Sequence, residues 1–302
     1  MHFCREIARR NRELGLRLCV GLDTDGEKVQ KMLGASDVYA AITTFNGAII
    51  DATRHVACAY KPNLWFYLAR GVEGYRALIW TVARICELGF PALLDAKPGD
   101  IGNTSEQIAK TVFDAIGADA TTVNCYLGGD AIQPILDRAE GGSIVICKTS
   151  NPGSAEFQDR LLIVSEEDLQ ELARGSLQQT QLSILLQFSG VKLWQVVALR
   201  VANHWNTNGN CGLVVGSTFP EEARVCREMV GPDVPMLVPA LGSQGGELVA
   251  SVKAAVGSDG QGVALFNVSR AIAGASTGSD FAEAAGKKAE WYHRAITAAL
   301  AT

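Results

Sequence analysis

The sequence lacks the residue patterns that mark metal-binding or disulfide-linked proteins. Its four histidines stand apart, with no H-x-H or H-E-x-x-H spacing, so the usual ligands of a hydrolytic metal site are missing. Its eight cysteines are scattered and form no C-x-x-C pair, which indicates reduced thiols in a cytosolic protein and argues against structural zinc. Any chemistry must therefore depend on other side chains.

Long hydrophobic runs are also missing. The most apolar stretch, residues 182–205, is interrupted by two glutamines, a lysine and an arginine, which a membrane span of about 20 apolar residues would hardly tolerate. Residues 1–15 are charged and contain no apolar segment typical of a signal peptide. We therefore expect a soluble, cytoplasmic protein.

The chain carries no excess of positive charge. Its 27 Lys and Arg against 32 Asp and Glu give a net charge of −5, and the basic residues are dispersed. This pattern argues against nucleic acid or an anionic membrane as a partner, and an anionic substrate would need a local cationic site. With 302 residues, of which 48% are hydrophobic, the chain can form one large domain or two small ones.

Short apolar runs recur along the chain, each followed by a helix-like stretch. They lie at residues 16–22, 57–61, 91–97, 118–124, 143–148, 211–216, 235–240 and 262–268. The runs do not alternate with polar residues, as expected for parallel strands that are buried on both faces. Eight such units without a flexible linker predict an α/β fold, a TIM (β/α)8 barrel, as a single domain over residues 1–302.

One spacing is irregular, because 68 residues separate the starts of the fifth and sixth runs. Residues 152–205 hold an acidic segment and then the long apolar stretch, too much for one crossover helix. We expect a helical insertion that covers the outside of the barrel or an oligomer face; an active-site lid is the alternative.

A regular helix is predicted after the third run. Asn103 or Thr104 would cap it, and Ile108, Val112 and Ile116 mark an apolar stripe that would face the barrel.

Charged side chains follow the second and third runs. Asp95 and Lys97 are two residues apart and would share one strand face at the barrel mouth, Asp100 follows on the loop, and Lys61 ends the preceding strand. An ordinary rim salt bridge is the alternative, but it would not explain why charges gather at strand ends. Two nearby carboxylates should keep Lys97 protonated, which suits a proton donor rather than a Schiff-base amine.

Polar groups suited to a ligand follow three other runs. Gln244 lies in a Gly-rich loop after the seventh run, and Arg270 follows the eighth, at the two loops where barrels commonly bind phosphate. Turn glycines and a surface arginine are the alternative. Thr149, Ser150 and Asn151 after the fifth run could orient a heterocyclic ring, although Ser-Asn-Pro is also a common turn.

Taken together, these segments resemble orotidine 5′-phosphate decarboxylase, in its bacterial branch. The Asp95-Ala-Lys97-Pro-Gly-Asp100-Ile101 run carries the resemblance, which extends over nearly the whole chain. The other matching segments are VGLD (20–23), YKPN (60–63), CKTSNPGS (147–154), GLVVGST (212–218), PALGSQGG (239–246) and SRAI (269–272).

The resemblance implies decarboxylation of orotidine 5′-phosphate to uridine 5′-phosphate, the last step of UMP biosynthesis, without a metal or organic cofactor. It implies a homodimer with shared active sites, in which Asp100 reaches into the neighbouring site. The roles that it implies are a charged tetrad of Lys61, Asp95, Lys97 and Asp100; ribose binding by Asp23 and Lys61; substrate contacts from Ile101 and, across the interface, Thr104; a pyrimidine contact from Ser150; and a phosphate grip from Gln244 and Arg270. Decarboxylation would leave a carbanion at C6, and a fixed ammonium such as Lys97 could stabilise and protonate it.

Three alternatives remain open at this point. A magnesium-dependent sugar-phosphate decarboxylase or synthase of the same barrel group would use the acidic residues to hold the metal. An aldolase would form a Schiff base through Lys97 or Lys148. A non-catalytic barrel would bind a nucleotide as a sensor or scaffold.

Overall fold

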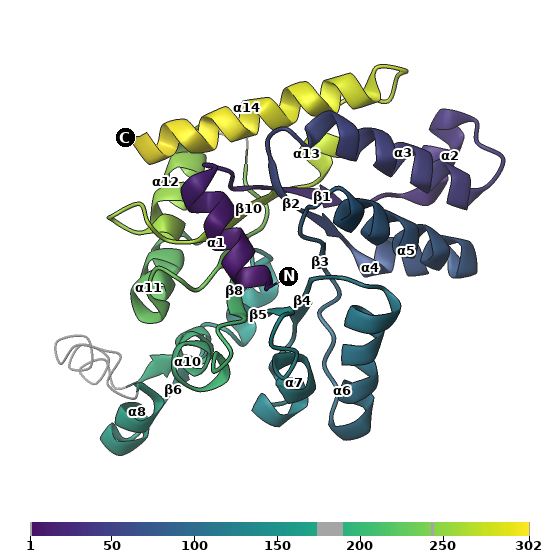
Figure 1. Ribbon diagram of the computed structural model, residues 1–302. Coiled ribbons are helices and arrows are strands. Elements are labelled where there is room, and N and C mark those ends of the chain that lie inside the picture. The colour runs from purple at the N-terminus through teal and green to yellow at the C-terminus, as the bar shows by residue number, and fades with distance from the viewer. Residues whose placement is uncertain (1, 174–189, 243–244, 302) are drawn as a thin grey trace.

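Eight parallel strands form one sheet in the computed structural model, which describes residues 2–173, 190–242 and 245–301 (Figure 1). The strands are β1 (Leu18–Leu22), β2 (Ala57–Pro62), β3 (Leu93–Leu94), β4 (Ala120–Val123), β5 (Gly142–Lys148), β8 (Cys211–Val215), β9 (Met236–Val238) and β10 (Ala264–Val268). Their order is β2-β1-β10-β9-β8-β5-β4-β3, and bridges from Tyr60 to Ala92 and from Asn63 to Asp95 join the two edges into a barrel. The predicted TIM barrel is confirmed.

Each predicted apolar run coincides with one of these strands to within a few residues at its ends. The residues of nearly all of them are buried, because helices cover the outside of the sheet and side chains fill its interior. The third run was predicted as a strand over residues 91–97, but β3 spans only Leu93–Leu94. Asp95 still forms a bridge with Asn63, but the strand cannot continue to Lys97, which takes a left-handed conformation with φ 52°.

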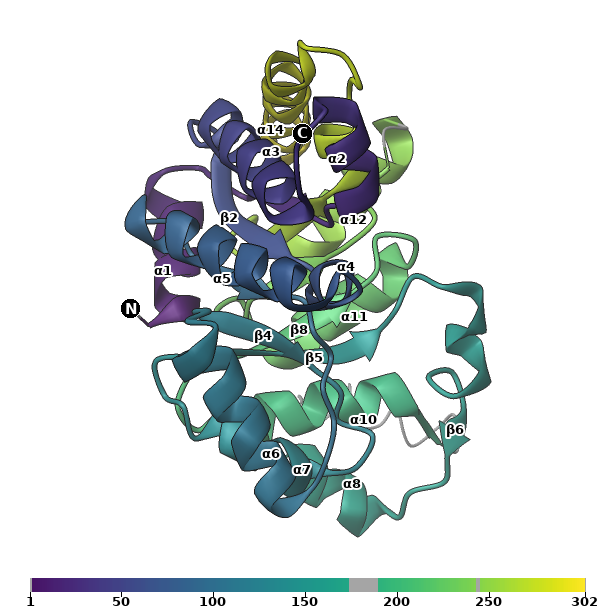
Figure 2. The same ribbon diagram turned by 90° about the vertical axis from the view of Figure 1, so that its right-hand side faces the viewer.

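Helices follow the strands around the barrel (Figure 2). They are α2 (Gly26–Leu33), α3 (Val38–Thr53), α4 (Leu64–Leu68), α5 (Gly71–Glu87), α6 (Gly102–Ala109), α7 (Gly129–Leu136), α11 (Pro220–Val230), α12 (Gly245–Val256), α13 (Arg270–Ala273) and α14 (Phe281–Ala301). The N-terminal helix α1 (Phe3–Glu13), which precedes β1, closes the end of the barrel where the strands begin. Its Phe3 and Ile7 pack with the innermost strand residues, so this end of the barrel is filled by apolar side chains.

The helix predicted after the third strand is present and differs at its start. The stripe residues Val112 and Ile116 are buried, as expected, and α6 continues directly into a π-helical turn, η1 (Lys110–Ala115). The predicted cap is wrong, because the helix begins at Gly102 and the capping position is Ile101, which offers no side-chain acceptor.

The connection from β5 to β8 contains the predicted helical insertion. It comprises the 3₁₀ turn η2 (Pro152–Glu156), β6 (Leu161–Leu162), α8 (Glu166–Ala173), β7 (Val191–Lys192), α10 (Leu193–Arg200) and the π-helical turn η3 (Val201–Trp205). The antiparallel pairing of β6 with β7 was not predicted. Part of the predicted apolar stretch, residues 182–189, lies outside the described residues. α10 packs on the barrel, since the Cys147 thiol of β5 contacts the Trp194 carbonyl at 3.1 Å, whereas β6 and α8 lie at the edge opposite α14 (Figure 2).

Candidate active site

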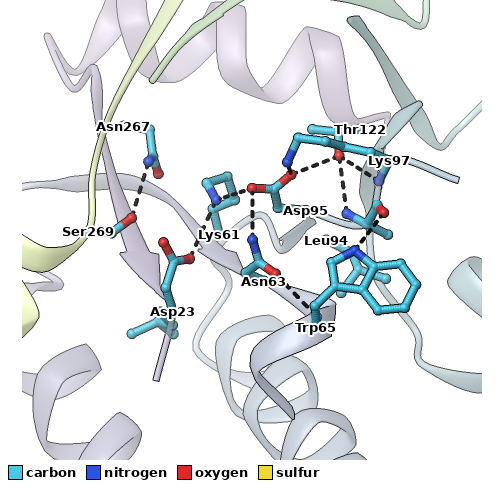
Figure 3. Close-up of polar contacts among 12 residues, drawn as sticks. Asp23, Lys61, Asn63, Trp65, Leu94, Asp95, Lys97, Thr122, Asn267 and Ser269 are labelled. Atoms are coloured by element: carbon cyan, nitrogen blue, oxygen red, sulfur yellow. Dashed lines mark hydrogen bonds and ion pairs between the residues drawn. The ribbon is translucent and has the colours of Figure 1, made fainter. Parts of the chain in front are cut away.

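Asp95 lies at the centre of a polar cluster at the open end of the barrel, directly after β3 (Figure 3). Four side-chain donors surround its buried carboxylate. Oδ2 accepts from Lys61 Nζ at 2.7 Å and Asn63 Nδ2 at 3.3 Å, while Oδ1 accepts from Thr122 Oγ1 at 3.0 Å and from Lys97 Nζ. The structure therefore brings together three of the four predicted charged residues.

The cluster keeps its groups charged. Burial alone would raise the pKa of the Asp95 carboxyl, but the ammonium groups of Lys61 and Lys97 outweigh it and lower the pKa to about 2. Burial would likewise lower the pKa of Lys61, yet the carboxylates of Asp95 and Asp23 raise it. Lys61 is almost fully buried, whereas the Lys97 side chain is 42% exposed, so the Lys97 ammonium is the more open of the two to a ligand in the mouth.

Asp23 extends this network along the barrel rim. It follows β1, and its Oδ1 lies 3.6 Å from Lys61 Nζ. This oxygen is buried and has no hydrogen-bond partner among the described residues. Such an acceptor is costly to bury unless a ligand or water supplies a donor.

The end of β10 contributes groups that the sequence analysis did not select. Asn267 donates through Nδ2 to Ser269 Oγ at 3.3 Å, and its own Oδ1 is buried without a partner among the described residues. A side chain at Gly21 would collide with Ser269, because an added Cβ would lie 1.8 Å from the serine Oγ. Glycine is therefore required where β1 passes β10.

Three other cluster residues were also missed, although Asn63 stands within the quoted YKPN run. Its Oδ1 accepts from the Trp65 backbone N–H at 3.2 Å, which starts α4, and the Trp65 indole donates to the Ala96 carbonyl at 3.1 Å. Thr122, on β4, is a polar residue in a strand that is buried on both faces. In the sequence, the signal is a polar residue inside a run that is predicted to form a fully buried strand.

Asp100, Ile101 and Thr104 do not reach the cluster of their own chain. The Asp100 carboxylate accepts from the Ile101 backbone N–H at 2.8 Å and makes no ion pair with any described residue. The Ile101 side chain is 58% exposed, and Thr104 is exposed on α6.

The residues at the end of β5 differ in what their side chains contact. Ser150 is half-buried and lies so close to β8 that an added Cβ at Gly216 would be 2.8 Å from its backbone N. Lys148 is fully buried and donates to Asp159 Oδ2 at 2.8 Å, so it is engaged away from the Asp95 cluster. Thr149 hydrogen-bonds Gln158 and thereby holds the loop together.

Arg270 begins α13, directly after β10, and its side chain is exposed. Within the described ranges, its guanidinium makes no hydrogen bond or ion pair, so this cation is free to take an anion. Gln244 lies outside the described residues, and the structure therefore does not place it. α12 begins directly after this position, at Gly245.

Two negative findings apply to the described part of the chain. It contains no group of three or more His, Cys, Asp or Glu residues arranged to hold a metal ion. Within the same ranges, no helix combines the length and the apolar character needed to cross a membrane.

Comparison with known proteins places these features in a family context. The sequence model described as "Orotidine 5′-phosphate decarboxylase / HUMPS family" matches residues 16–285. The orotidine 5′-phosphate decarboxylase of Herpetosiphon aurantiacus is 42% identical over 90% of this chain and 90% of its own, and that of Ralstonia pickettii is 40% identical over 94% of each. The solved structure of Leishmania donovani OMP decarboxylase is similar with a TM-score of 0.74 and 32% identity, covering 98% of this chain and 99% of that one.

Proposed function

Because the chain belongs to the orotidine 5′-phosphate decarboxylase family, we propose that its Asp95 cluster converts orotidine 5′-phosphate to uridine 5′-phosphate. The chain is accordingly a carboxy-lyase of pyrimidine biosynthesis. The observation that carries the assignment of the site is one buried carboxylate held between two ammonium groups at adjacent strand ends.

Lys97 is the proton donor in this proposal. Loss of CO₂ leaves an electron pair at C6 in the plane of the pyrimidine, where the ring cannot delocalise it, so a nearby ammonium is needed to stabilise and then protonate it. The exposed ammonium of Lys97 is held in place by the Asp95 carboxylate (Figure 3). At about 4 Å and an effective dielectric constant near 20, one such charge contributes roughly 4 kcal/mol, equivalent to about a thousandfold in rate.

Asp95 has two tasks in the same step. It holds both ammonium groups in place, and its negative charge faces the position of the substrate carboxylate. Repulsion between the two carboxylates falls as CO₂ leaves, so this interaction favours the transition state over the bound substrate.

The remaining contacts would bind the nucleotide. Asp23 and Lys61 take the ribose hydroxyls, which is supported by Asp23 Oδ1, a buried acceptor that receives no hydrogen bond from the described residues. Ser150 contacts the pyrimidine from the end of β5. Arg270, whose guanidinium is free within the described ranges, takes the phosphate together with Gln244.

The active enzyme would be a homodimer in which Asp100, Ile101 and Thr104 complete the partner's site. This proposal is supported by the Asp100 carboxylate, which makes no hydrogen bond or ion pair with the described residues of its own cluster, and by exposed apolar side chains next to the 97–101 loop. Trp65 is 58% exposed, and its indole donates to the carbonyl of Ala96, which directly precedes the loop. Tyr126 is 73% exposed and lies two residues after Asn124, whose backbone N–H donates to the Pro98 carbonyl. Exposed aromatic side chains on both sides of this loop support an interaction surface there.

Three broader expectations belong to the same proposal. The chain would act as one barrel domain over residues 1–302, with 152–205 as an insertion. It would work in the cytoplasm, which is supported by eight cysteines that are all free thiols, two of them only 3.8 Å apart at Cys147 and Cys226. Its net charge of −5 supports a small-molecule substrate rather than nucleic acid or a membrane as partner.

Replacement of Lys97 tests this function. In Lys97→Ala, we expect kcat for orotidine 5′-phosphate to fall at least about a thousandfold, while the Kd for uridine 5′-phosphate changes by less than about tenfold. Lys110→Ala, which removes an exposed lysine of η1, is the matched control and should leave turnover unchanged. Near-normal turnover in Lys97→Ala would contradict the proton-donor assignment. Activity of the unmodified chain that disappears in EDTA would instead favour the magnesium-dependent alternative.

A further inference from the structure

The Thr122 hydroxyl uses its full hydrogen-bonding capacity on three consecutive residues of the active-site strand end. It accepts from the backbone N–H groups of Ala96 and Lys97, each at 3.1 Å, and contacts Asp95 Oδ1 at 3.0 Å (Figure 3). A hydroxyl has one proton and two lone pairs. Since the two N–H groups can only donate, the hydroxyl proton must point at the Asp95 carboxylate.

These bonds act where the backbone is least relaxed. Lys97 has a φ of 52°, a conformation that a residue with a Cβ rarely adopts. The Lys97 N–H donates to both the hydroxyl and the carbonyl of Thr122, so a residue of β4 stabilises the turn at Lys97. Thr122 is buried, and its contacts are therefore not exchanged with bulk water.

The same oxygen that Thr122 contacts also accepts from the Lys97 ammonium. A shift of this oxygen, or of the turn at Lys97, would move the ammonium relative to a substrate held by other residues. Misplacement of a reacting group by about 1 Å can cost about a hundredfold in rate.

We propose that Thr122 is a positioning residue that fixes the Asp95 carboxylate and the Lys97 turn in the geometry required for proton transfer. This inference rests on the proposed roles of Asp95 and Lys97. Thr122 itself does not touch the reacting atoms in this proposal; it acts through the two charged residues.

The strand provides a matched control at the neighbouring position. Thr121 is also fully buried, and its hydroxyl donates to the Leu94 carbonyl at 3.0 Å without contacting Asp95. Thr121→Val and Thr122→Val thus remove the same chemical group from adjacent buried sites of β4. Thr122→Ser restores the hydroxyl.

The experiment compares kcat, KM and melting temperature in these three variants. In Thr122→Val, we expect kcat to fall by about 10- to 100-fold and KM to change by less than about threefold. Thr122→Ser should keep kcat within about threefold of the unmodified chain, and Thr121→Val should lower the melting temperature while leaving kcat unchanged. If Thr122→Val does not fold, Thr122→Ala removes the same hydroxyl with less crowding and is judged by the same criteria.

Three results would overturn the proposal: an unchanged kcat in Thr122→Val, equal losses of kcat in the two valine variants, or a serine variant no better than valine. Each concerns differences among the threonine variants. A failure of the proposed function would be seen elsewhere, as absent decarboxylation by the unmodified chain or as normal turnover in Lys97→Ala.

Discussion

The low pKa of Asp95 makes the stability of the fold depend on acid in a way that one substitution can isolate. The pKa of Asp95 is about 2 in the folded chain, whereas an aspartate in an unfolded chain has a pKa of about 3.9. The unfolded chain therefore binds this proton first as the pH falls. The ionised group contributes roughly 2 to 3 kcal/mol of stability, which is complete above about pH 5 and lost as the pH falls towards 2, with about half lost by pH 3.

Asp95→Asn removes this titration. The variant will be less stable at neutral pH, because Lys61 and Lys97 lose their charged partner, but the difference in unfolding free energy from the unmodified chain should shrink by about 1 kcal/mol between pH 5 and pH 3. Urea unfolding at fixed protein concentration, repeated across this range, gives that difference. Asp51→Asn, which removes a half-exposed carboxylate paired with Arg84 at 3.3 Å, sets the baseline for unrelated acid effects. A difference that stays constant with pH in Asp95→Asn would refute the reasoning.

Two further predictions concern the phosphate site and the shared active site. Arg270→Ala should raise KM for orotidine 5′-phosphate by about 10- to 100-fold, because one charge-assisted hydrogen bond is lost. Turnover of the phosphate-free nucleoside should be unchanged in this variant. A large loss of turnover with the nucleoside would contradict the phosphate role. Lys97→Ala and Asp100→Ala should each be inactive alone, yet mixing them with subunit exchange should restore about a quarter of the activity, because each mixed dimer then has one intact site. No recovery would place Asp100 in its own subunit's site.

The strands were predictable because their burial leaves a direct trace in the sequence. A parallel strand covered by helices must be apolar on both faces, and all eight apolar runs fold in this way. The pairing of β6 with β7 has no such trace. Each of these strands has only two residues, and both residues of β6, Leu161 and Leu162, are exposed. The start of α6 was missed for a related reason: the best capping residue by type, Asn103, lies inside the helix that begins one residue earlier.

The charged half of the site was predictable, whereas its neutral supports were not. Lys61, Asp95 and Lys97 could be joined because charged residues at adjacent strand ends must meet at the barrel mouth. The hydroxyl of Thr122 reaches Asp95 only because β3 and β4 pair with Leu94 opposite Thr121. That register depends on the closed barrel, and the spacing of residues along the chain does not contain it.

Stability alone gives no reason for a cluster of this kind. Taking charges out of water costs several kcal/mol for each ion, and replacing a buried ion pair by apolar residues of similar volume is often neutral or stabilising. Lys61 and Asp95 are nonetheless buried together, and Asn63 and Thr122 supply the hydrogen bonds that two ions alone would leave unmade. In a chain with a net charge of −5, this arrangement leaves an exposed ammonium at Lys97 that an anionic nucleotide can approach. The buried carboxylate thus keeps the Lys61 ammonium charged and fixes both ammonium groups in position, which is the requirement that the proposed proton delivery to C6 imposes.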